Sequence, residues 1–339
     1  MMSTSLPPLR IGILGAAKIA RGFVAGVAGS RKVKVASIAS RDIERCRAFA
    51  RETGVPQVHD SYEALLADPA IDAIYNPLPN TLHAQWSIRA AEAGKHVLCE
   101  KPLAVSAAEA RAMFAAAERH RVHLVEAFPY RAQPQTQKVQ ELIANRAIGT
   151  VQFVRASFGI AVNDAANIRL DPLLSGGALM DTGSYTVNFV RMIVGERPSR
   201  VSAVARWGAS GVDLTMVANL EHPGGVLAQI SCSFATALHR QATVAGDGGI
   251  IDTTFANHTA TIAQSSLQVK IGAARDAPTI TIETSPVDGF LAEAESFADL
   301  IAHGPAHWTG TSHAESIDNM TTLEAIAASA RQALSLIHI

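Results

Sequence analysis

The segment from Leu9 to Ala20 constrains the fold more than any other part of this sequence. Leu9–Leu14 is a short apolar run typical of a buried strand, and a glycine turn and a helical pattern follow it. This order opens a dinucleotide-binding βαβ unit, because glycine permits the tight turn and the helix start offers free N–H groups to phosphate. Alanines replace two of the three usual glycines, so an ordinary βα turn stays open as an alternative. The residues predicted to hold a pyrophosphate are Gly15, Ala16, Ala17, Lys18 and Ile19.

The end of the second expected strand, Lys34–Ala39, favours NADP over NAD. NAD sites usually carry Asp or Glu here to bond the ribose 2′-hydroxyl, whereas this strand ends in Ser40 and Arg41. Arg45 follows about one helical turn later. A hydroxyl and two guanidinium groups suit a 2′-phosphate, because arginine presents planar, charged donors. The alternative is a solvated helix start with Ser40 as its N-cap.

The stretch Val97–Pro102 sets a carboxylate and an ammonium side by side at the end of another expected strand. Glu100 and Lys101 follow the apolar run directly, and Pro102 prevents a simple continuation of the strand. Ligands bind at the carboxyl ends of the strands in open parallel sheets, so these two side chains are expected in a site. The proline-stiffened loop 76–80 follows the expected strand 71–75 and is predicted to line the same site.

Length and charge limit the remaining possibilities. At 339 residues the chain is expected to form two domains, and we place them at 1–127 and 128–339. The balance of 29 basic and 30 acidic residues gives no electrostatic reason to expect a nucleic acid or an anionic membrane as partner. No apolar run reaches membrane-spanning length, and no signal peptide is recognised.

Cysteine and histidine spacing gives no reason to expect a metal. Cys46, Cys99 and Cys232 are scattered, without a metal-binding or disulfide pattern, which fits a cytoplasmic protein. His120, His123 and Glu126 are metal-ligand residue types close together, but His123 lies inside a strand pattern, so we expect no metal site there.

Five segments, in order, resemble the glucose-fructose oxidoreductase, inositol dehydrogenase and rhizopine-catabolism (Gfo/Idh/MocA) family. They are Gly15-Ala-Ala-Lys-Ile-Ala20, Asn76-Pro-Leu-Pro-Asn-Thr-Leu-His83, Ala93-Gly-Lys-His-Val-Leu-Cys-Glu-Lys-Pro102, Glu126-Ala-Phe-Pro-Tyr-Arg131 and Gly176-Gly-Ala-Leu-Met-Asp-Thr-Gly-Ser-Tyr185. Within the family, the chain looks most similar to the branch of dimeric dihydrodiol dehydrogenase and NADP-dependent D-xylose 1-dehydrogenase. The resemblance implies an α/β fold with an N-terminal Rossmann domain and a C-terminal α+β domain. Alternating strands with tight turns from 198 to 283 predict that the second domain carries a large, mostly antiparallel open sheet.

The resemblance also implies an NADP-dependent oxidoreductase that transfers a hydride between nicotinamide and a sugar, cyclic polyol or dihydrodiol hydroxyl. Tyr185 stands where many members have histidine and is expected to be the acid/base. Lys101 is expected to lower the pKa of Tyr185, because a nearby ammonium favours the phenolate. Asp181 lies four residues before Tyr185 on an expected helix, 177–192, and so on the same face.

The remaining roles complete the predicted site. Asp181, Arg169 and Glu100 are expected to line the substrate site: Asp181 and Arg169 hold substrate hydroxyls, and Glu100 orients Lys101. Core packing is the alternative for Tyr185, and a helix-start charge for Asp181. Beyond the turn residues, the cofactor is expected to contact Ser40, Arg41, Arg45, Pro77, Leu78, Asn80, His83, Glu100, Lys101 and Arg131.

Two rival functions stay open at this point. One is a relative that keeps its cofactor bound and uses transient oxidation for another reaction, such as glycoside cleavage. The other is a sugar sensor that binds a dinucleotide without catalysis; a proton-transfer pair at Lys101 and Tyr185 argues against it. The substrate, the direction of reaction and the number of subunits are not fixed by these residues, although the open sheet face suits a homodimer.

Overall fold

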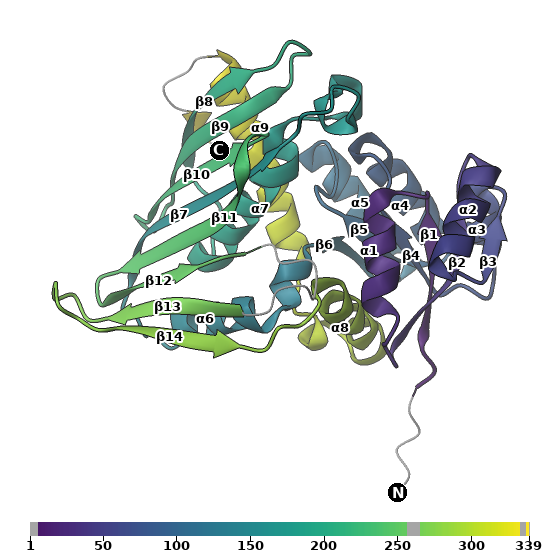
Figure 1. The fold of residues 1–339 in the computed structure, drawn as a ribbon, viewed down its shortest axis with the longest axis horizontal. Coiled ribbons are helices and arrows are strands. Elements are labelled where there is room, and N and C mark those ends of the chain that lie inside the picture. Colours follow the sequence, from purple (N-terminus) through teal and green to yellow (C-terminus); the bar gives the residue numbers. More distant parts are fainter. Residues whose placement is uncertain (1–5, 256–264, 333–336, 339) are drawn as a thin grey trace, which may run out of the picture.

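The computed structural model describes residues 6–255, 265–332 and 337–338, which fold into two sheets with helices packed around and between them (Figure 1). The first sheet has six parallel strands in the order β3-β2-β1-β4-β5-β6. They are β1 (Leu9–Leu14), β2 (Val33–Ala39), β3 (Gln57–His59), β4 (Ala73–Asn76), β5 (His96–Glu100) and β6 (Leu124–Ala127). The connecting helices are α1 (Lys18–Val27), α2 (Ile43–Thr53), α3 (Tyr62–Ala67), α4 (His83–Glu92) and α5 (Ala107–His120). This arrangement confirms the predicted Rossmann sheet.

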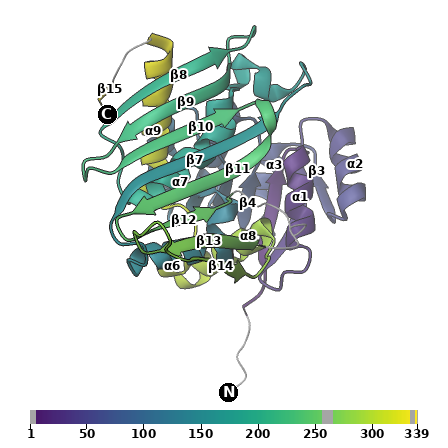
Figure 2. The same cartoon turned by 60° about the vertical axis from the view of Figure 1, so that its left-hand side comes forward.

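The second sheet has nine strands in the order β14-β13-β12-β11-β7-β10-β9-β8-β15, and Figure 2 shows it face on. Its strands are β7 (Val151–Ala161), β8 (Arg200–Trp207), β9 (Asp213–Glu221), β10 (Leu227–Ser233), β11 (Ala235–Gly246), β12 (Gly249–Thr253), β13 (Ser265–Ile271), β14 (Thr279–Thr284) and β15 (Ile337–His338). Only β7 and β10 pair in parallel among the described strands of this sheet. The predicted large, mostly antiparallel sheet is confirmed.

Three helices cover the face of the nine-stranded sheet that is turned toward the first sheet (Figure 1). They are α6 (Pro134–Ala144), α7 (Ser184–Val194) and α9 (His313–Gln332). Side chains along these strands alternate between the two faces of the sheet. On β7, Val154, Ala156 and Phe158 are buried beneath the helices, and the residues between them face outward. The amphipathic pattern of residues 315–336 predicts one helix; α9 is described to Gln332, and residues 333–336 lie outside the described part.

One late helix returns to the first sheet. In α8 (Gly289–His303), Phe290, Ala294 and Phe297 pack with buried residues of β1 and α1. These positions follow the i, i+4, i+7 spacing of an apolar helix face. Through α8, the C-terminal third of the chain contributes to the core beneath the Rossmann sheet.

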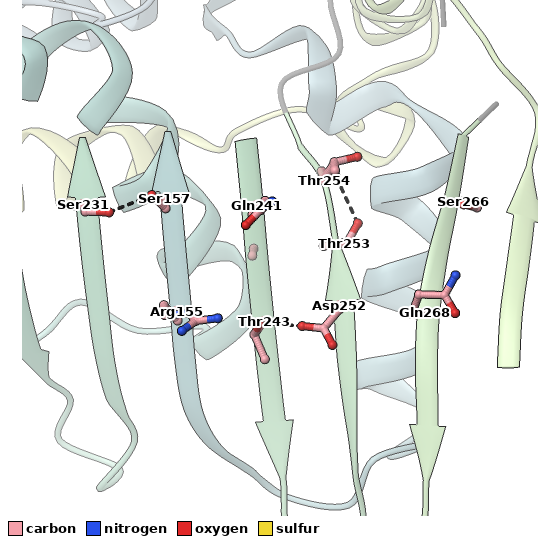
Figure 3. Close-up of a pocket in the computed structure, with 11 residues that line it drawn as sticks. Arg155, Ser157, Ser231, Gln241, Thr243, Asp252, Thr253, Thr254, Ser266 and Gln268 are labelled. Atoms are coloured by element: carbon pink, nitrogen blue, oxygen red, sulfur yellow. Dashed lines mark hydrogen bonds between the residues drawn. The ribbon is translucent and has the colours of Figure 1, made fainter. Parts of the chain in front are cut away.

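The outward face of the nine-stranded sheet carries a polar hollow of about 680 Å³ (Figure 3). Several of its polar groups already bond to one another: Ser231 donates to Ser157 at 2.7 Å, and Thr243 to Asp252 at 2.5 Å. The hollow lies on the side of this sheet away from the helices and from the carboxyl ends of the Rossmann strands. Its lining residues are Arg155, Ser157, Ser231, Gln241, Ala242, Thr243, Asp252, Thr253, Thr254, Ser266 and Gln268.

Candidate active site

An ion-paired carboxylate joins the two parts of the chain at the end of β5. Asp181 accepts from Lys101 Nζ at 2.5 Å through Oδ1 and from Arg169 Nε at 2.6 Å through Oδ2. Arg169 lies in the short helical turn η3 (Ile168–Leu170). Burial alone would raise the pKa of Asp181, but the two cations outweigh it and hold this pKa well below its usual range. The structure thus brings together three of the residues predicted for the site.

Tyr185 lies directly beneath Lys101. The ammonium sits 4.9 Å from the centroid of the phenol ring, within the range of a cation–π contact. The ring is buried among other aromatic rings, with centroids of Phe128 at 5.3 Å and Phe158 at 5.4 Å. Lys101 therefore touches both Asp181 and Tyr185, as expected if the last two share one face.

The helix that carries this pair is less regular than predicted. In place of one α-helix over 177–192, a π-helical turn η5 (Leu179–Gly183) precedes α7. Asp181 lies in the wide turn and Tyr185 in the first turn of α7. π-Turns of this kind are frequent at functional sites, where they shift side chains out of α-helical register.

Lys101 does not bring the pKa of Tyr185 below its ordinary value in this structure. The pKa of Tyr185 is raised well above its ordinary value of 10, first by burial and then by the negative charges of Glu100 and Asp181. The Lys101 ammonium, whose charge favours the phenolate, is paired with Asp181 at 2.5 Å.

Glu100 bonds to Tyr75 and to the backbone of Lys101. Its Oε1 accepts from the hydroxyl of Tyr75 at 2.6 Å, and its Oε2 accepts from the backbone N–H of Lys101 at 3.3 Å. The carboxylate that holds the Lys101 ammonium is that of Asp181. Burial raises the pKa of Glu100, against the attraction of Lys101.

A second buried carboxyl near the site was not predicted. Glu293 on α8 is 1% exposed, and its charge acts on Glu100, Tyr75 and Tyr185. Burial, and then Glu100, raise the pKa of Glu293 well above its usual range. A signal for it was present in the sequence, since Glu293 falls between Phe290 and Phe297 on the apolar face of its helix.

The glycine turn has the geometry that was predicted. Gly15 has a φ of 88°, and a Cβ there would meet the Leu78 side chain at 2.9 Å. Helix α1 follows, and its N-cap residue Ala17 offers no capping side chain. Its first N–H groups are therefore available to an anion.

The two arginines after β2 lie beside this turn. Arg45 donates to the carbonyl of Ala16 at 3.2 Å, and Arg41 lies near the hydroxyl of Tyr62. The alternative in which Ser40 caps the next helix is wrong, because Asp42 is the N-cap and accepts from Arg45 N at 3.0 Å.

The loop after β4 is fixed to its surroundings by side chains predicted to bind cofactor. The His83 ring lies between two carbonyl oxygens, that of Pro102 at 2.8 Å and that of Leu78 at 2.7 Å. Burial lowers the pKa of His83 to about 4. Asn80 donates to the carbonyl of Ser175 at 3.0 Å. This network ties the loop that contains Pro77 to the Lys101 segment and to the second part of the chain.

Arg131 is buried and ion-paired. It contacts Glu315 on α9 at 3.1 Å, and its side chain is 4% exposed. In this structure the two residues join the segment after β6 to α9.

Among the described residues, no group of His, Cys, Asp or Glu side chains is arranged to hold a metal ion. No helix in the described ranges is both long and apolar enough to cross a membrane.

Comparison with known families and proteins places this geometry in context. Residues 9–128 match the model of an oxidoreductase family with an NAD-binding Rossmann fold, and residues 136–252 match the GFO/IDH/MocA C-terminal domain. The chain is 39% identical to D-xylose 1-dehydrogenase (NADP(+)) 2 of Haloferax volcanii, over 95% of this chain and 97% of that protein. It is 37% identical to trans-1,2-dihydrobenzene-1,2-diol dehydrogenase of Xenopus tropicalis, over 71% of this chain and 73% of that protein.

Solved structures agree with these relatives. An aldose-aldose oxidoreductase from Caulobacter crescentus, complexed with glycerol, superposes with a TM-score of 0.87 at 26% identity, over 98% of this chain and 100% of that one. A 3-ketoreductase from Actinomadura kijaniata, in complex with NADP and TDP-benzene, superposes with a TM-score of 0.85 at 29% identity, over 95% of this chain and 98% of that one. The chain belongs to the Gfo/Idh/MocA family of oxidoreductases.

Proposed function

We propose that this protein is an NADP-dependent dehydrogenase that oxidises or re-forms a CH–OH group on a sugar, cyclic polyol or dihydrodiol. The observation that carries the proposal is the placement of the Lys101 ammonium against both Tyr185 and Asp181 at the carboxyl end of β5. A proton-transfer side chain, a cation and an orienting carboxylate are what alcohol oxidation requires beside a nicotinamide. The relatives named as NADP-dependent xylose and dihydrodiol dehydrogenases support the same chemistry.

The residues present fit a bound dinucleotide. The positive φ of Gly15, 88°, favours glycine at this turn, and the uncapped start of α1 presents N–H groups where a pyrophosphate would lie. Arg41 and Arg45, which emerge beside that turn, would hold a 2′-phosphate, and this supports NADP. When bound, the nicotinamide supplies the hydride acceptor or donor.

The side chains of this protein account for the proton. In the oxidation direction, the phenolate oxygen of Tyr185 would take the proton of the substrate hydroxyl, and in the reverse direction the Tyr185 hydroxyl would return that proton. Lys101 would donate a hydrogen bond to the reacting oxygen and keep it near Tyr185. Arg169 and Asp181 would bond neighbouring hydroxyls, and Asp181 also fixes the ammonium of Lys101.

A spectrophotometric assay tests the proposal. D-xylose, D-glucose and a trans-dihydrodiol would each be offered with NADP and with NAD, and reduced nicotinamide would be followed by its absorbance. We expect turnover with at least one substrate and a preference for NADP. Turnover that is faster with NAD would refute the assignment of Arg41 and Arg45 to the 2′-phosphate.

We further propose a cytoplasmic homodimer that pairs through the outward face of the nine-stranded sheet. Phe153 and Leu227 are adjacent partners on β7 and β10 and are 38% and 52% exposed on that face. Three buried cysteines without disulfides suit a reducing compartment. Sedimentation of the wild type and of Phe153→Glu tests the dimer, which the charged variant is expected to weaken.

A further inference from the structure

One peptide group next to Lys101 is held at both of its polar ends. It is the peptide between Pro102 and Leu103. Nδ1 of His83 lies 2.8 Å from its carbonyl oxygen, and its N–H donates to Oε1 of Glu126 at 2.9 Å. Both of these residues are 1% exposed, so water has little access to compete for the two contacts. The peptide therefore has a fixed orientation beside the site.

The two side chains that hold this peptide come from opposite sides of β5. Glu126 lies on β6, and its register partner on β5 is Cys99, two residues before Lys101. His83 is the first residue of α4, which follows the loop after β4. Because β4 and β6 flank β5 in the sheet, the segment after Lys101 is tied to both neighbouring strands.

The proline after Lys101 gives the Leu103 N–H a particular role. Pro102 has no N–H, so the first backbone donor that follows Lys101 is that of Leu103. On the other side, the N–H of Lys101 itself donates to Oε2 of Glu100 at 3.3 Å, at the end of β5. Glu126 thus supplies the anchor on the far side of Lys101.

A carboxyl at position 126 is an unfavourable group to bury. Burial raises the pKa of Glu126 to about 7, against the attraction of the Lys101 charge. An apolar side chain would avoid this cost, but it would leave the buried N–H of Leu103 without its acceptor. Groups with such perturbed pKa values are frequent at functional sites.

We propose that Glu126 and His83 are positioning residues that act on the reaction through Lys101. By holding the two ends of the next peptide, they fix the backbone from which the Lys101 ammonium reaches its partners at the site. The inference rests on the proposed function, since it requires Lys101 to donate to the reacting oxygen. A displacement of about 1 Å at a reacting group can reduce the rate about 10²-fold.

Steady-state kinetics of alcohol oxidation with NADP test the inference on two variants of Glu126. Glu126→Leu removes the acceptor, and its kcat should fall about 10²-fold, while NADPH binding, titrated by fluorescence, should stay within a few-fold of wild type. Glu126→Gln keeps a carbonyl oxygen as acceptor and should retain a kcat within a few-fold of wild type. Ser329→Ala is the matched control: the buried Ser329 hydroxyl accepts from the N–H of Ala203 at 3.0 Å in the other sheet, and its loss should leave kcat unchanged.

A double-mutant cycle with Lys101→Met separates positioning from a general loss of structure. If Glu126 acts through Lys101, adding Glu126→Leu to Lys101→Met should not lower the single-turnover rate further than Lys101→Met alone. A purely structural role would instead multiply the two losses. His83→Phe removes the contact at the other end of the peptide, and its own cycle with Lys101→Met tests the inference if Glu126→Leu does not fold.

Three results would overturn the inference. The first is wild-type kcat in Glu126→Leu when Lys101→Met is inactive. The second is a loss of kcat that Glu126→Gln shares although it retains the wild-type thermal midpoint, since the accepted bond would then not be the cause. The third is multiplied losses in either double variant. Wild-type turnover in both Lys101→Met and Tyr185→Phe would refute the proposed function, and this inference with it.

Discussion

Replacing Asp181 by asparagine should destabilise the protein by several kcal/mol. The carboxylate holds Lys101 and Arg169 through both oxygens, and the Lys101 side chain is 11% exposed. Removing one partner of a buried pair costs about 3–5 kcal/mol, because an uncompensated charge stays buried. Arg169 is 44% exposed, so its pair adds only about 0.2–1 kcal/mol. We expect a loss of about 3–5 kcal/mol at pH 7.

Urea unfolding of Asp181→Asn at several pH values measures this loss. Because the pKa of Asp181 is lowered in the folded state, its contribution is present above the unfolded value of about 3.9 and is lost as the pH falls below it. The difference in the free energy of unfolding between Asp181→Asn and wild type should therefore become smaller below about pH 4. Asp299→Asn, which removes an exposed pair with Lys32, is the control and should cost at most about 1 kcal/mol. A loss in Asp181→Asn no greater than in the control would refute this reasoning.

Three further predictions follow from buried or constrained groups. Burial raises the pKa of Glu126 from 4.5 to about 7, so its ionisation destabilises the fold as the pH rises through this interval. Between pH 4.5 and 7.5, the free energy of unfolding of Glu126→Gln should therefore rise by up to about 3 kcal/mol relative to that of wild type. Free energies of unfolding that depend on pH in the same way in both proteins would contradict this. Gly15→Val should abolish dinucleotide binding in a fluorescence titration, because its φ of 88° and the Leu78 contact exclude the side chain; wild-type affinity would show that the turn is not the binding loop. Arg45→Gln should weaken NADP binding about 10–100-fold and leave NAD binding nearly unchanged, since a hydrogen bond to a charged group contributes about 1.5–3 kcal/mol; an equal loss for both cofactors would contradict the 2′-phosphate assignment.

Local patterns predicted the fold and the identity of the central site residues. The strand and glycine turn at Leu9–Gly15 and the carboxylate and ammonium after β5 follow from strand ends, which a parallel sheet gathers at one edge. Asp181 and Tyr185 were expected from the family resemblance of residues 176–185, and their spacing of four predicted a shared helix face; the structure sets both beside Lys101. These features depend on residues close together in the sequence.

The electrostatics of the site could not be predicted in this way. Whether Lys101 lowers the pKa of Tyr185 depends on which group neutralises the ammonium, and that is decided by a carboxylate 80 residues away. Glu293 reaches the site from α8, and its charge raises the pKa of Tyr185. Only the packing of the second sheet against the first brings these charges together.

Paired measurements on Tyr185→Phe and Lys101→Met test the central claim most directly. Each variant would be titrated with NADPH by fluorescence and assayed for turnover with the best wild-type substrate. The account predicts NADPH binding within a few-fold of wild type for Tyr185→Phe, with turnover reduced by about 10²–10⁴-fold, the usual contribution of a positioned acid/base. Lys101→Met should lose turnover to a similar degree. Wild-type turnover in Tyr185→Phe would contradict the account, because no other described phenol is in contact with the Lys101 ammonium.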